Sequence, residues 1–385
     1  MSYNFEISLN FQHQIFFERD VFGEKSQVLD EALSCSSGRS SRVLVFIEEG
    51  LREVFPDLGA RVGEKLQGMS SLDERGLLYL VGGEQCKVDD SVYQQACDAI
   101  ADAGIDRHSY VFALGGGAFL DVIGFAAATV HRGVRLVRFP TTTLSQDDSG
   151  VGVKSGINKY GKKNFMGAFA VPYAVINDFD FLHSQPESVR LDGLVEAIKV
   201  ALVKDGVFFD WLEANLARLV DLEKTALEEA VERSAVLHAS HIAEGGDPFE
   251  SGSSRPLDFG HWAAHKLEQL SQFKLTHARA VAIGLALDCL YSVKKGFLAA
   301  EDGERILILL ERMGLPVWSE HLDERLDNGQ RAVFQGLEEF REHLGGQLTI
   351  LLLRQPGQGV EVHEMCEETL EACLAELQSR SCNLV

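Results

Sequence analysis

The sequence predicts an α/β domain with a parallel, Rossmann-like sheet, followed by a mainly α-helical domain. Three observations support this fold class. Short continuous apolar runs recur in the first half, at residues 43–47, 77–81 and 110–114, as in strands buried on both faces of a parallel sheet. The last run leads directly into Gly115, Gly116 and Gly117. From residue 190 onward, apolar residues follow a helical period instead.

The first half alternates strands and helices along the chain. Residues 3–9 alternate apolar and polar side chains, which predicts a half-buried strand. A segment of helical period at 91–103 separates the second and third apolar runs. Strand, helix, strand and glycine turn in succession predict an open parallel sheet with right-handed crossovers. Residues 141–169 are mostly small and polar without a helical period, which predicts a long functional loop.

The second half of the sequence predicts mainly helices and one strand near the C-terminus. Residues 191–216 predict one long helix and the start of another, and the pattern continues at 222–243 and 299–312. Residues 348–353 return to a strand pattern, and a last helix is expected from about 366 to 377. The predicted domains are therefore an NAD-binding α/β domain at 1–185 and a helical domain at 186–385, the latter binding metal and substrate.

Composition restricts the class of protein and its partners. A chain of 385 residues is long enough for two ordinary domains. A formal charge of −22 argues against nucleic acid as a partner, because phosphate backbones need a basic face. It leaves a small phosphorylated molecule possible, since that needs only a few local cations. The sequence contains no apolar run of about 18 uncharged residues, so no membrane-spanning helix is expected.

Seven scattered cysteines, an odd number without a CxxC pair, suit free thiols in a reducing compartment. The first residues lack a charged flank followed by an apolar core, so no signal peptide is expected. The predicted location is the cytoplasm.

Three histidines lie within seventeen residues. His261 and His265 are four apart in a segment of helical spacing, and His277 precedes a long apolar run. Both imidazoles of the pair would leave one face of the helix. Imidazole is the commonest metal ligand, and a catalytic zinc site uses three protein ligands with an open fourth position. The alternative is a helix pair whose histidines lie on the surface or in the core.

The glycine turn is a candidate phosphate site. A strand that runs into glycines and then a helix lets backbone amides and the helix N-terminus meet a pyrophosphate. The pattern is GGG, which differs from the ordinary GxGxxG fingerprint. Glu84, after the second apolar run, could accept ribose hydroxyls; the alternative is an acid on a surface turn.

A charged pair interrupts the predicted helix that follows residue 190. Glu196 and Lys199 are three apart in an otherwise apolar segment, where a charge costs free energy unless something binds it. Glu196 could complete a Glu-His-His set with His261 and His277. The alternative is an ordinary surface salt bridge.

Five motifs in order identify a family resemblance. They are GGGAFLD (115–121), PTTTLSQDDSGVGVKSGINKYGKKN (140–164), GLVEAIK (193–199), DFGHWAAH (258–265) and LTHARAVAIG (275–284). They resemble the successive motifs of the 3-dehydroquinate synthase family, the founding member of the sugar phosphate cyclases. The resemblance covers about residues 40 to 350.

The resemblance implies a role for each matching residue. The metal ligands, usually for zinc or cobalt, would be Glu196, His261 and His277. NAD would be bound by Glu84, Lys87, Gly115, Gly116, Gly117, Asp121, Thr141 and Thr142. The substrate pocket would contain Asp148, Lys154, Lys163, Asn164, Lys199 and His265. Arg132 matches an arginine that reaches the phosphate, in some members from the partner subunit of a homodimer.

The resemblance also implies the reaction, that of a phosphate-eliminating carbon-oxygen lyase. A secondary alcohol of a ketose phosphate is oxidised transiently by NAD, and the new ketone acidifies the neighbouring C–H. Phosphate is then eliminated, the ketone is reduced again, the ring opens, and an intramolecular aldol step closes a carbocycle. The metal polarises the reacting oxygens, and NAD is not consumed.

Departures from the family pattern bear on the substrate. Where the family reads RxxLNFGH, this chain reads SRPLDFGH, so Asp258 replaces an asparagine and Pro256 displaces Arg255 from its register. His241 stands where a lysine is usual, and Glu342 with His343 stands where a lysine pair is usual. A pocket with Asp258 and fewer cations would repel a carboxylate and accept sugar hydroxyls.

These departures favour a substrate without a carboxylate. The chain resembles the 2-epi-5-epi-valiolone synthase-like branch, which implies sedoheptulose 7-phosphate as the substrate and a place in cyclitol biosynthesis. The alternatives are 3-dehydroquinate synthase activity or a cyclase acting on another sugar phosphate.

Two more distant readings remain. A metal-dependent alcohol dehydrogenase of the glycerol dehydrogenase type shares the architecture and the glycine turn, but it lacks the loop at 148–164. A cyclase relic acting as a binding or regulatory protein would be expected to lose Lys154 or His261, and both are present.

Overall fold

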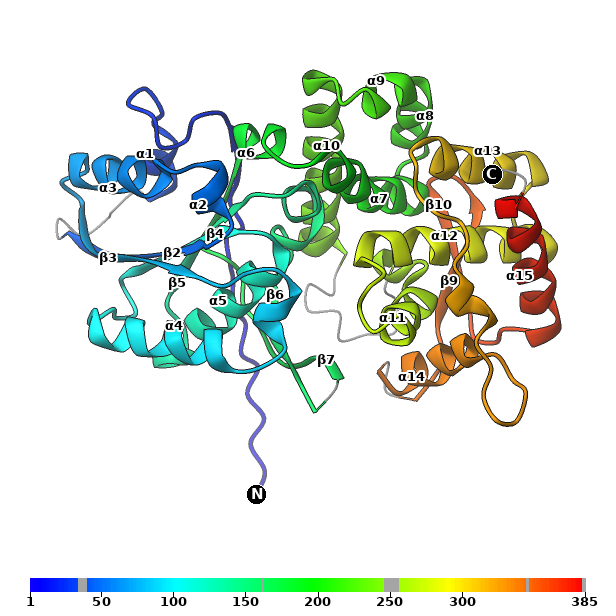
Figure 1. Ribbon diagram of the computed structural model, residues 1–385. Helices are drawn as coiled ribbons and strands as arrows, with labels where there is room; N and C mark the ends of the chain where they lie inside the picture. The colour runs from blue at the N-terminus through cyan, green and yellow to red at the C-terminus, as the bar shows by residue number, and fades with distance from the viewer. Residues whose placement is uncertain (34–39, 161, 246–255, 344–345, 383–385) are drawn as a thin grey trace. The chain divides into compact units, whose positions relative to one another are not determined.

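The computed structural model describes residues 1–33, 40–160, 162–245, 256–343 and 346–382. The chain forms two compact units (Figure 1). The first contains Met1–Ser145 and Ser149–Ser184, and the second contains Gln146–Asp148 and Gln185–Val385.

The first unit is built on a six-stranded parallel sheet in the order β1-β8-β5-β4-β2-β3. Its strands are β1 (Ile15–Glu18), β2 (Ser41–Glu48), β3 (Leu72–Leu80), β4 (Tyr110–Gly115), β5 (Arg135–Pro140) and β8 (Ala174–Asp178). Its helices are α1 (Val28–Ala32), α2 (Leu51–Val54), α3 (Leu58–Gly68), α4 (Ser91–Asp102), α5 (Gly117–Thr129) and α6 (Phe179–His183), with short 3-10 turns at Glu84–Lys87 and Val130–Arg132.

Alternate residues of the central strands enter two separate cores. Val45 and Phe112 pack on the face that carries α1 and α3, whereas Phe46 and Val111 pack on the face that carries α4 and α5. Figure 1 shows helices on both faces of the sheet. A strand with both faces covered must be apolar throughout, which explains the runs at 43–47 and 110–114 and confirms the predicted parallel sheet.

The prediction for residues 77–81 is wrong in one respect. These residues lie in and just after β3, but most of them are half-buried rather than fully buried. The reason is that β3 lies at the edge of the sheet and pairs only with β2.

Residues 3–9 do not form the predicted strand. Residues 1–14 belong to no strand, and the first twelve are exposed. The alternating pattern indicates which face could be buried, but a strand also needs a neighbour with which to pair. No neighbour is present for this segment among the described residues.

The long loop predicted at 141–169 contains regular structure. Ser145–Ser149 form one π-helical turn, and β6 (Lys154–Lys159) and β7 (Lys162–Phe169) form an antiparallel two-stranded ribbon. β7 is largely exposed, so it shows no apolar alternation from which a strand could be predicted.

The second unit is mainly helical, as predicted. Its helices are α7 (Glu187–Lys204), α8 (Gly206–Ala214), α9 (Leu216–Val220), α10 (Lys224–Glu244), α11 (His261–Leu270), α12 (His277–Lys294), α13 (Ala300–Arg312), α14 (Gln335–His343) and α15 (Glu367–Cys382). Short 3-10 turns lie at Pro256–Asp258, Glu320–Asp323 and Ala332–Phe334, and β9 (Ile350–Gln355) pairs antiparallel with β10 (Gln358–Val362).

Two helices form the centre of this unit. α12 is buried along nearly its whole length, and α7 is buried from Gly193 to Val203. α7 packs against α10 and α12, and α11 packs against α12. Side chains near the starts of α11 and α12 are thereby brought toward α7. Within the described part of the chain, no helix combines the length and the hydropathy needed to cross a bilayer.

Candidate functional site

The glycine turn lies at the carboxyl end of the central strand β4. The Gly116 amide donates a hydrogen bond of 2.7 Å to Oε2 of Glu48, and the Gly83 amide donates one of 3.0 Å to Oε1. A Cβ atom at Gly115 would lie 2.6 Å from the Phe119 ring, and one at Gly117 would lie 2.4 Å from the Ser149 hydroxyl. A side chain at either position would force these neighbours to move, so glycine lets α5 begin directly after the turn.

Glu48 is a site residue that the sequence reasoning missed. It ends β2, and its carboxylate holds two loops at the carboxyl edge of the sheet. Glu84, predicted for the ribose, is exposed at the start of a 3-10 turn. An acid directly after the apolar run at 43–47 was the available signal, because acidic residues that recognise ribose follow strands of such sheets.

Lys87 and Asp121, two residues predicted to bind NAD, contact each other. Lys87 Nζ lies 2.7 Å from Asp121 Oδ2, and Lys87 is buried. Burial alone would lower the pKa of Lys87, but Asp121 raises it above its ordinary value. The lysine is therefore a fixed cation beside the start of α5.

Thr141 and Thr142 lie beside the glycine turn. The Thr141 amide donates to the Gly115 carbonyl at 3.1 Å, and Thr142 borders Gly116. The structure thus brings the predicted threonines and glycines together.

Arg138, which no sequence pattern indicated as a site residue, organises the loop that leads to Lys154. It is fully buried in β5 and donates to the carbonyls of Gly150, Gly152 and Lys154 at 3.1, 2.6 and 3.0 Å and to the Ser155 hydroxyl at 2.9 Å. Burial lowers the pKa of Arg138 to about 10, so it remains charged at neutral pH. Lys154 begins β6 with an exposed side chain.

The other residues of this unit that were predicted to bind the substrate do not form one cluster. Lys163 and Asn164 lie on β7, and Asn164 has φ 52° with its amide donating to Asn158 Oδ1 at 2.9 Å. Arg132 is exposed with φ 63°, between His131 at φ 52° and Gly133 at φ 118°. Among the described residues, Arg132 makes no hydrogen bond or ion pair, so the structure does not bring it to the others.

Glu196, His261 and His277 form a cluster in the second unit. Glu196 lies on α7, and the histidines are the first residues of α11 and α12. Glu196 Oε1 lies 4.0 Å from His261 Nε2 and 3.7 Å from His277 Nε2. Glycines permit the helices to approach, because a Cβ atom on Gly284 would lie only 2.0 Å from the Gly260 carbonyl oxygen.

These three residues fit a metal ion. Glu196 is 1% exposed, and a buried carboxylate needs a positive partner. His261 Nδ1 lies 3.0 Å from the Phe259 carbonyl, which leaves Nε2 as the ligand atom. Two ligands about 2.1 Å from a tetrahedral zinc ion lie roughly 3.4 Å apart, close to the distances in this cluster.

A network of charges surrounds Lys199. Its Nζ forms an ion pair with Glu196 and lies 3.8 Å from Asp148 Oδ1. Burial alone would lower the pKa of Lys199, but Glu196, Asp148 and Asp258 raise it above its ordinary value. Burial also lowers the pKa of His261 well below its ordinary value, and Lys199 lowers it further. The lysine is thus charged, and His261 is neutral, as a metal ligand must be.

His238 is a second missed residue. It is buried on α10, with Nδ1 3.0 Å from Asp148 Oδ1. Burial by itself would raise the pKa of Asp148, whereas Lys199 and His238 lower it well below its ordinary value. Sequence reasoning considered His241, which is half-buried; the packing of α10 against α7 selects His238 instead.

Asp147 is a buried carboxylic acid beside this network. Neither of its oxygens has a hydrogen-bond partner among the described residues. Burial raises the pKa of Asp147 well above its ordinary value, and Asp148 and Glu196 raise it further. Its pKa is thus shifted in the opposite direction from that of Asp148.

Glu268 contacts the other nitrogen of His277. Its Oε2 lies 3.3 Å from His277 Nδ1, and its side chain is buried. His265, Glu268 and His277 form a second group with donor atoms close enough for a metal ion, and His277 belongs to both groups. The His265 ring is exposed, with its centroid 5.4 Å from that of His261.

Asp258 lies half-buried in the 3-10 turn before α11, where it contributes to the raised pKa of Lys199. Its charge therefore acts on a cation as well as on any substrate. Arg255 and the side chains of Pro256 and His343 lie outside the described residues, so the departures at these positions have no structural account.

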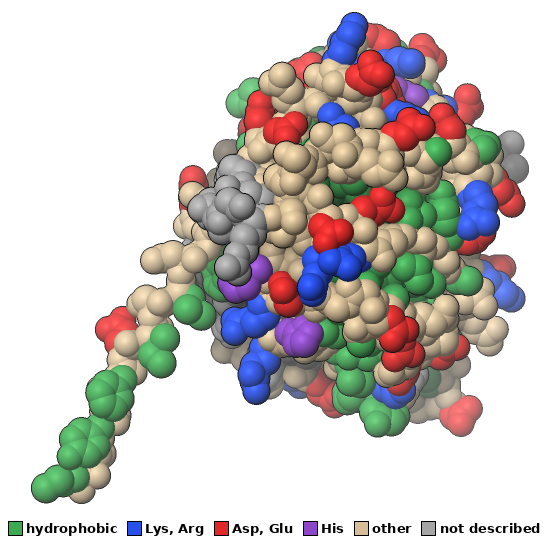
Figure 2. All heavy atoms as spheres, turned by 90° about the vertical axis from the view of Figure 1, so that its left-hand side faces the viewer, with side chains coloured by type: hydrophobic (Ala, Val, Ile, Leu, Met, Phe, Trp, Pro, Cys, Tyr) green, Lys and Arg blue, Asp and Glu red, His purple; other side chains and the backbone are tan. Residues whose placement is uncertain are grey.

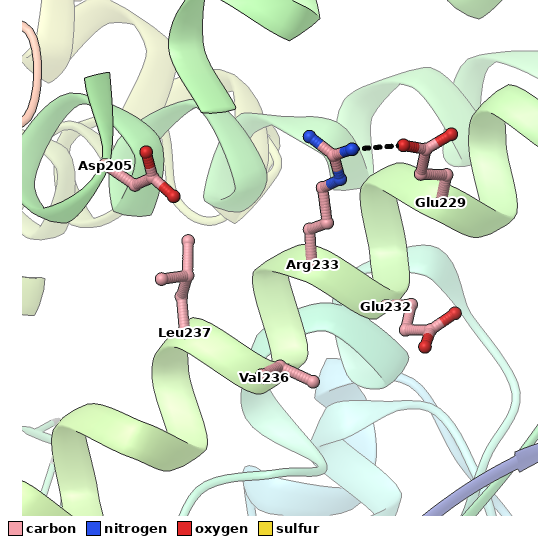
Figure 3. A pocket seen from close by; sticks show the side chains of 6 residues that line it. All are labelled: Asp205, Glu229, Glu232, Arg233, Val236 and Leu237. Atoms are coloured by element: carbon pink, nitrogen blue, oxygen red, sulfur yellow. Dashed lines mark hydrogen bonds and ion pairs between the residues drawn. The ribbon is translucent and has the colours of Figure 1, made fainter. Parts of the chain in front are cut away.

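A hollow of about 460 Å³ lies elsewhere on this unit (Figure 3). Asp205, Glu229, Glu232, Arg233, Val236 and Leu237 line it. Arg233 is already paired with Glu229 and lies 4.8 Å from the centre of the Trp211 ring. The lining includes none of the predicted site residues, and we assign it no function.

Comparisons with known proteins agree on one family. Residues 77–191 match the model for the N-terminal domain of 3-dehydroquinate synthase, and residues 193–331 match the model for its C-terminal domain. The chain is 34% identical over 351 residues to a 3-dehydroquinate synthase of Halorhodospira halophila, covering 91% of this chain and 94% of that relative. A Geobacter 3-dehydroquinate synthase is 44% identical over 221 residues, 57% of this chain and 60% of the relative.

Solved structures show the same architecture. The 2-epi-5-epi-valiolone synthase ValA of Streptomyces hygroscopicus subsp. jinggangensis, with NAD+ and Zn2+ bound, has a TM-score of 0.85 and 25% identity, over 98% of this chain and 100% of that one. A 2-deoxy-scyllo-inosose synthase complexed with carbaglucose-6-phosphate, NAD+ and Co2+ has a TM-score of 0.76 and 20% identity, over 94% and 96%. An iron-containing alcohol dehydrogenase has a TM-score of 0.64 and 15% identity, over 96% and 98%. The last two likenesses concern the fold alone.

Proposed function

We propose that this chain, which belongs to the 3-dehydroquinate synthase family, is an NAD- and metal-dependent cyclase that converts sedoheptulose 7-phosphate to a carbocyclic product. The observation that carries the proposal is the buried Glu196, His261 and His277 cluster with Lys199 paired to its carboxylate. An alcohol oxidation followed by phosphate elimination needs a metal, a hydride acceptor and fixed cations, and the chain has residues for each.

NAD would be held in the first unit by the glycine turn, Lys87, Asp121 and the Thr141–Thr142 pair, with Glu48 holding the turn in shape. Bound there, NAD supplies a reversible hydride acceptor. The pyrophosphate would meet the start of α5, and Lys87, held by Asp121 of that helix, supplies a fixed positive charge.

Zinc or cobalt would be held by Glu196, His261 and His277. The metal would polarise the substrate oxygens during oxidation and aldol closure. Lys199 stays protonated between Glu196 and Asp148, so it stabilises negative charge that develops on those oxygens. His238 holds Asp148 in place.

Proton transfer and phosphate binding are assigned to the remaining residues. His265 is the solvent-accessible imidazole beside the two ligand histidines, and an imidazole exchanges protons near neutral pH. Lys154, Lys163, Asn164 and Arg132 are assigned to the phosphate. Arg132 is exposed and unpaired among the described residues, as a residue would be that reaches a partner subunit in a homodimer.

The choice of substrate depends on charge. A substrate carboxylate would need cations, and this chain replaces a lysine of the family pattern by His241 and a lysine pair by Glu342 and His343. Asp258 adds a negative charge near Lys199. Sugar hydroxyls donate hydrogen bonds to such a carboxylate, whereas a second carboxylate is repelled.

The second candidate is 3-dehydroquinate synthase activity itself. It is favoured by the name of the Halorhodospira halophila relative, which is 34% identical over 91% of this chain. The two candidates share every step and differ in whether the substrate carries a carboxylate.

The test offers each substrate separately. Purified protein with NAD and zinc or cobalt is incubated with sedoheptulose 7-phosphate or with 3-deoxy-arabino-heptulosonate 7-phosphate, and phosphate release and product mass are followed. Phosphate from the first alone is expected. Release from the second alone would assign the chain to the quinate activity, and release from neither would overturn the proposed substrate.

A further inference from the structure

Asp288, in the second half of α12, holds both residues that flank His261 in the sequence. Its Oδ2 accepts a hydrogen bond of 3.1 Å from the Gly260 amide, and its Oδ1 accepts one of 2.9 Å from Trp262 Nε1. We propose that Asp288 is a positioning residue for the metal site: through the Phe259–Gly260 peptide it fixes the His261 imidazole in the orientation that presents Nε2. The inference rests on the metal site of the proposed function and adds a residue that acts on one of its ligands.

Asp288 is a fully buried carboxyl group, and both of its oxygens accept hydrogen bonds. Acidic side chains commonly lie in water, as the red side chains on the face in Figure 2 show, whereas Asp288 is 0% exposed and Trp262 is 1% exposed. A buried carboxyl group costs free energy, and an apolar residue of similar volume would fill the same place at lower cost. Packing alone therefore does not account for an acid at this position of α12.

The hydrogen bond to Gly260 leads directly to the His261 ring. The Gly260 N–H and the Phe259 carbonyl belong to one peptide unit, and the carbonyl oxygen lies 3.0 Å from His261 Nδ1. A trans peptide unit is planar, with its N–H and C=O pointing in opposite directions, so Asp288 fixes the direction of the carbonyl by holding the N–H. A carbonyl that accepts the Nδ1 proton fixes the ring and its tautomer and leaves Nε2 for a metal ion.

α12 holds Gly260 from a second side. α11 and α12 lie side by side (Figure 1), and Gly260, just before α11, has φ 78°. A Cβ atom on Gly260 would lie 2.8 Å from the Leu285 amide nitrogen, and the Gly260 carbonyl oxygen lies against Gly284. Gly284 and Asp288 are four apart and so share one face of α12. The backbone at the start of α11 is thus fixed by close contact and by the carboxylate together.

The same face of α12 begins with the other histidine ligand. His277 is the first residue of α12, and Gly284 and Asp288 follow it by seven and eleven residues. At about 100° per residue, the three positions lie within about 20° of one line along the helix. Asp288 therefore sets His261 relative to His277. Metal ligands must lie within about 0.2 Å of their ideal distances, and directional hydrogen bonds supply such precision better than apolar contacts do.

Zinc affinities of three variants, measured by competition with a chromophoric chelator, test the inference. In Asp288→Asn the NH2 group must face either the Gly260 amide or the Trp262 indole, and two donors cannot form a hydrogen bond, so zinc affinity should fall about tenfold. Trp262→Phe keeps the bond to Gly260, so affinity should change by less than about threefold. In the double variant the NH2 group can face the phenyl ring while the amide oxygen accepts from Gly260, so affinity should return to within about threefold of the wild type.

Tyr291→Phe is the matched control. The Tyr291 hydroxyl, also on α12, accepts from the Cys366 amide at 2.8 Å, so the variant loses a hydrogen bond of the same helix without affecting Gly260. Urea unfolding should show a loss of stability, whereas zinc affinity should equal that of the wild type. If Asp288 had only a structural role, zinc affinity would follow stability in all variants, and the double variant would bind zinc more weakly than either single variant.

The Nδ1 proton of His261 gives a second measurement. In the cobalt-loaded protein, protons on metal-bound imidazoles are shifted out of the main NMR spectrum, and those of His261 and His277 face different acceptors, the Phe259 carbonyl and Glu268. Both protons should exchange slowly with water in the wild type. Asp288→Asn should speed the exchange of one signal, and Glu268→Gln should speed that of the other.

The outcomes separate this inference from the metal site on which it rests. Wild-type zinc affinity in Asp288→Asn, a double variant weaker than Asp288→Asn, or a His261 proton that exchanges rapidly in the wild type would overturn the role of Asp288 and leave the metal site in place. A wild type that binds no zinc, or a His261→Ala variant that binds it equally well, would overturn the metal site and this inference with it.

Discussion

Glu268→Gln should weaken metal binding without removing a metal ligand. Glu268 is buried on α11, with Oε2 3.3 Å from His277 Nδ1. The two atoms make no hydrogen bond in the described structure, but a carboxylate at this distance would accept the Nδ1 proton once Nε2, 3.7 Å from Glu196, holds a metal ion. Glutamine has the same shape as glutamate but no charge. Its NH2 group can also face the Nδ1–H group of the imidazole, and two donors cannot form a hydrogen bond.

The magnitude follows from the chemistry of such outer partners. Their loss typically costs 10-fold to 100-fold in metal affinity, which corresponds to about 1.4 to 2.7 kcal/mol. The assay is competition for zinc with a chromophoric chelator, together with the visible spectrum of the cobalt-loaded protein. Glu268→Gln should keep one metal per chain and the cobalt spectrum of the wild type.

Glu339→Gln is the matched control. Glu339 also contacts α11, through Lys266 at 2.6 Å, but its side chain is about half exposed. Its zinc affinity should equal that of the wild type. Wild-type affinity in Glu268→Gln would refute the reasoning. If Glu268→Gln alters the cobalt spectrum and His265→Ala loses as much zinc affinity as Glu268→Gln does, the metal is bound by the group of His265, Glu268 and His277 instead.

Three further predictions address the nucleotide, the substrate and pH. Glu48→Gln should raise the dissociation constant for NAD about tenfold, because a glutamine amide can accept from only one of the two backbone N–H donors. The control Glu84→Gln, at an exposed residue, should change this constant less than twofold. Equal effects of the two variants in a fluorescence titration with NAD would contradict the role of Glu48. Asp258→Asn should lower turnover of sedoheptulose 7-phosphate about tenfold, and unchanged turnover in the phosphate-release assay would show that the charge argument is wrong. Burial raises the pKa of Asp288 to about 7 from 3.8, so the folded state holds a proton that the unfolded state releases, and stability should fall as pH rises from about 4 to 7. Urea unfolding at pH 5 and pH 8 should show a smaller difference in Asp288→Asn, and an identical difference would exclude Asp288 as the cause.

The buried strands and helices were predictable because burial on all sides leaves an unmistakable composition. β4 is apolar throughout since helices cover both faces of the sheet, and α12 is apolar throughout since other elements surround it. The β6–β7 ribbon was not predictable, because β7 is largely exposed and begins with two lysines and an asparagine. Residues 3–9 show the opposite case, where a strand pattern exists without a strand to pair with.

The site residues that could be predicted are those whose residue type indicates their chemistry. Residues that act by positioning others through packing could not be predicted. Glu196, His261 and His277 could be found because metal ligands belong to few residue types and occurred in recognisable motifs. Arg138 and His238 act by holding a loop and a carboxylate. The partners of Arg138 lie in the loop 12 to 17 residues after it, and the partner of His238 lies in the turn after β5. No spacing in the sequence indicates such contacts.

The central claim is that NAD is borrowed and returned during a cyclisation. The most direct measurement supplies NAD at a small fraction of the sedoheptulose 7-phosphate and follows phosphate release and absorbance at the NADH band together, with His261→Ala in parallel. We expect many equivalents of phosphate per NAD, no accumulation of NADH, and neither bound metal nor turnover in His261→Ala. NADH that accumulates in step with substrate loss, or full activity in His261→Ala, would contradict it.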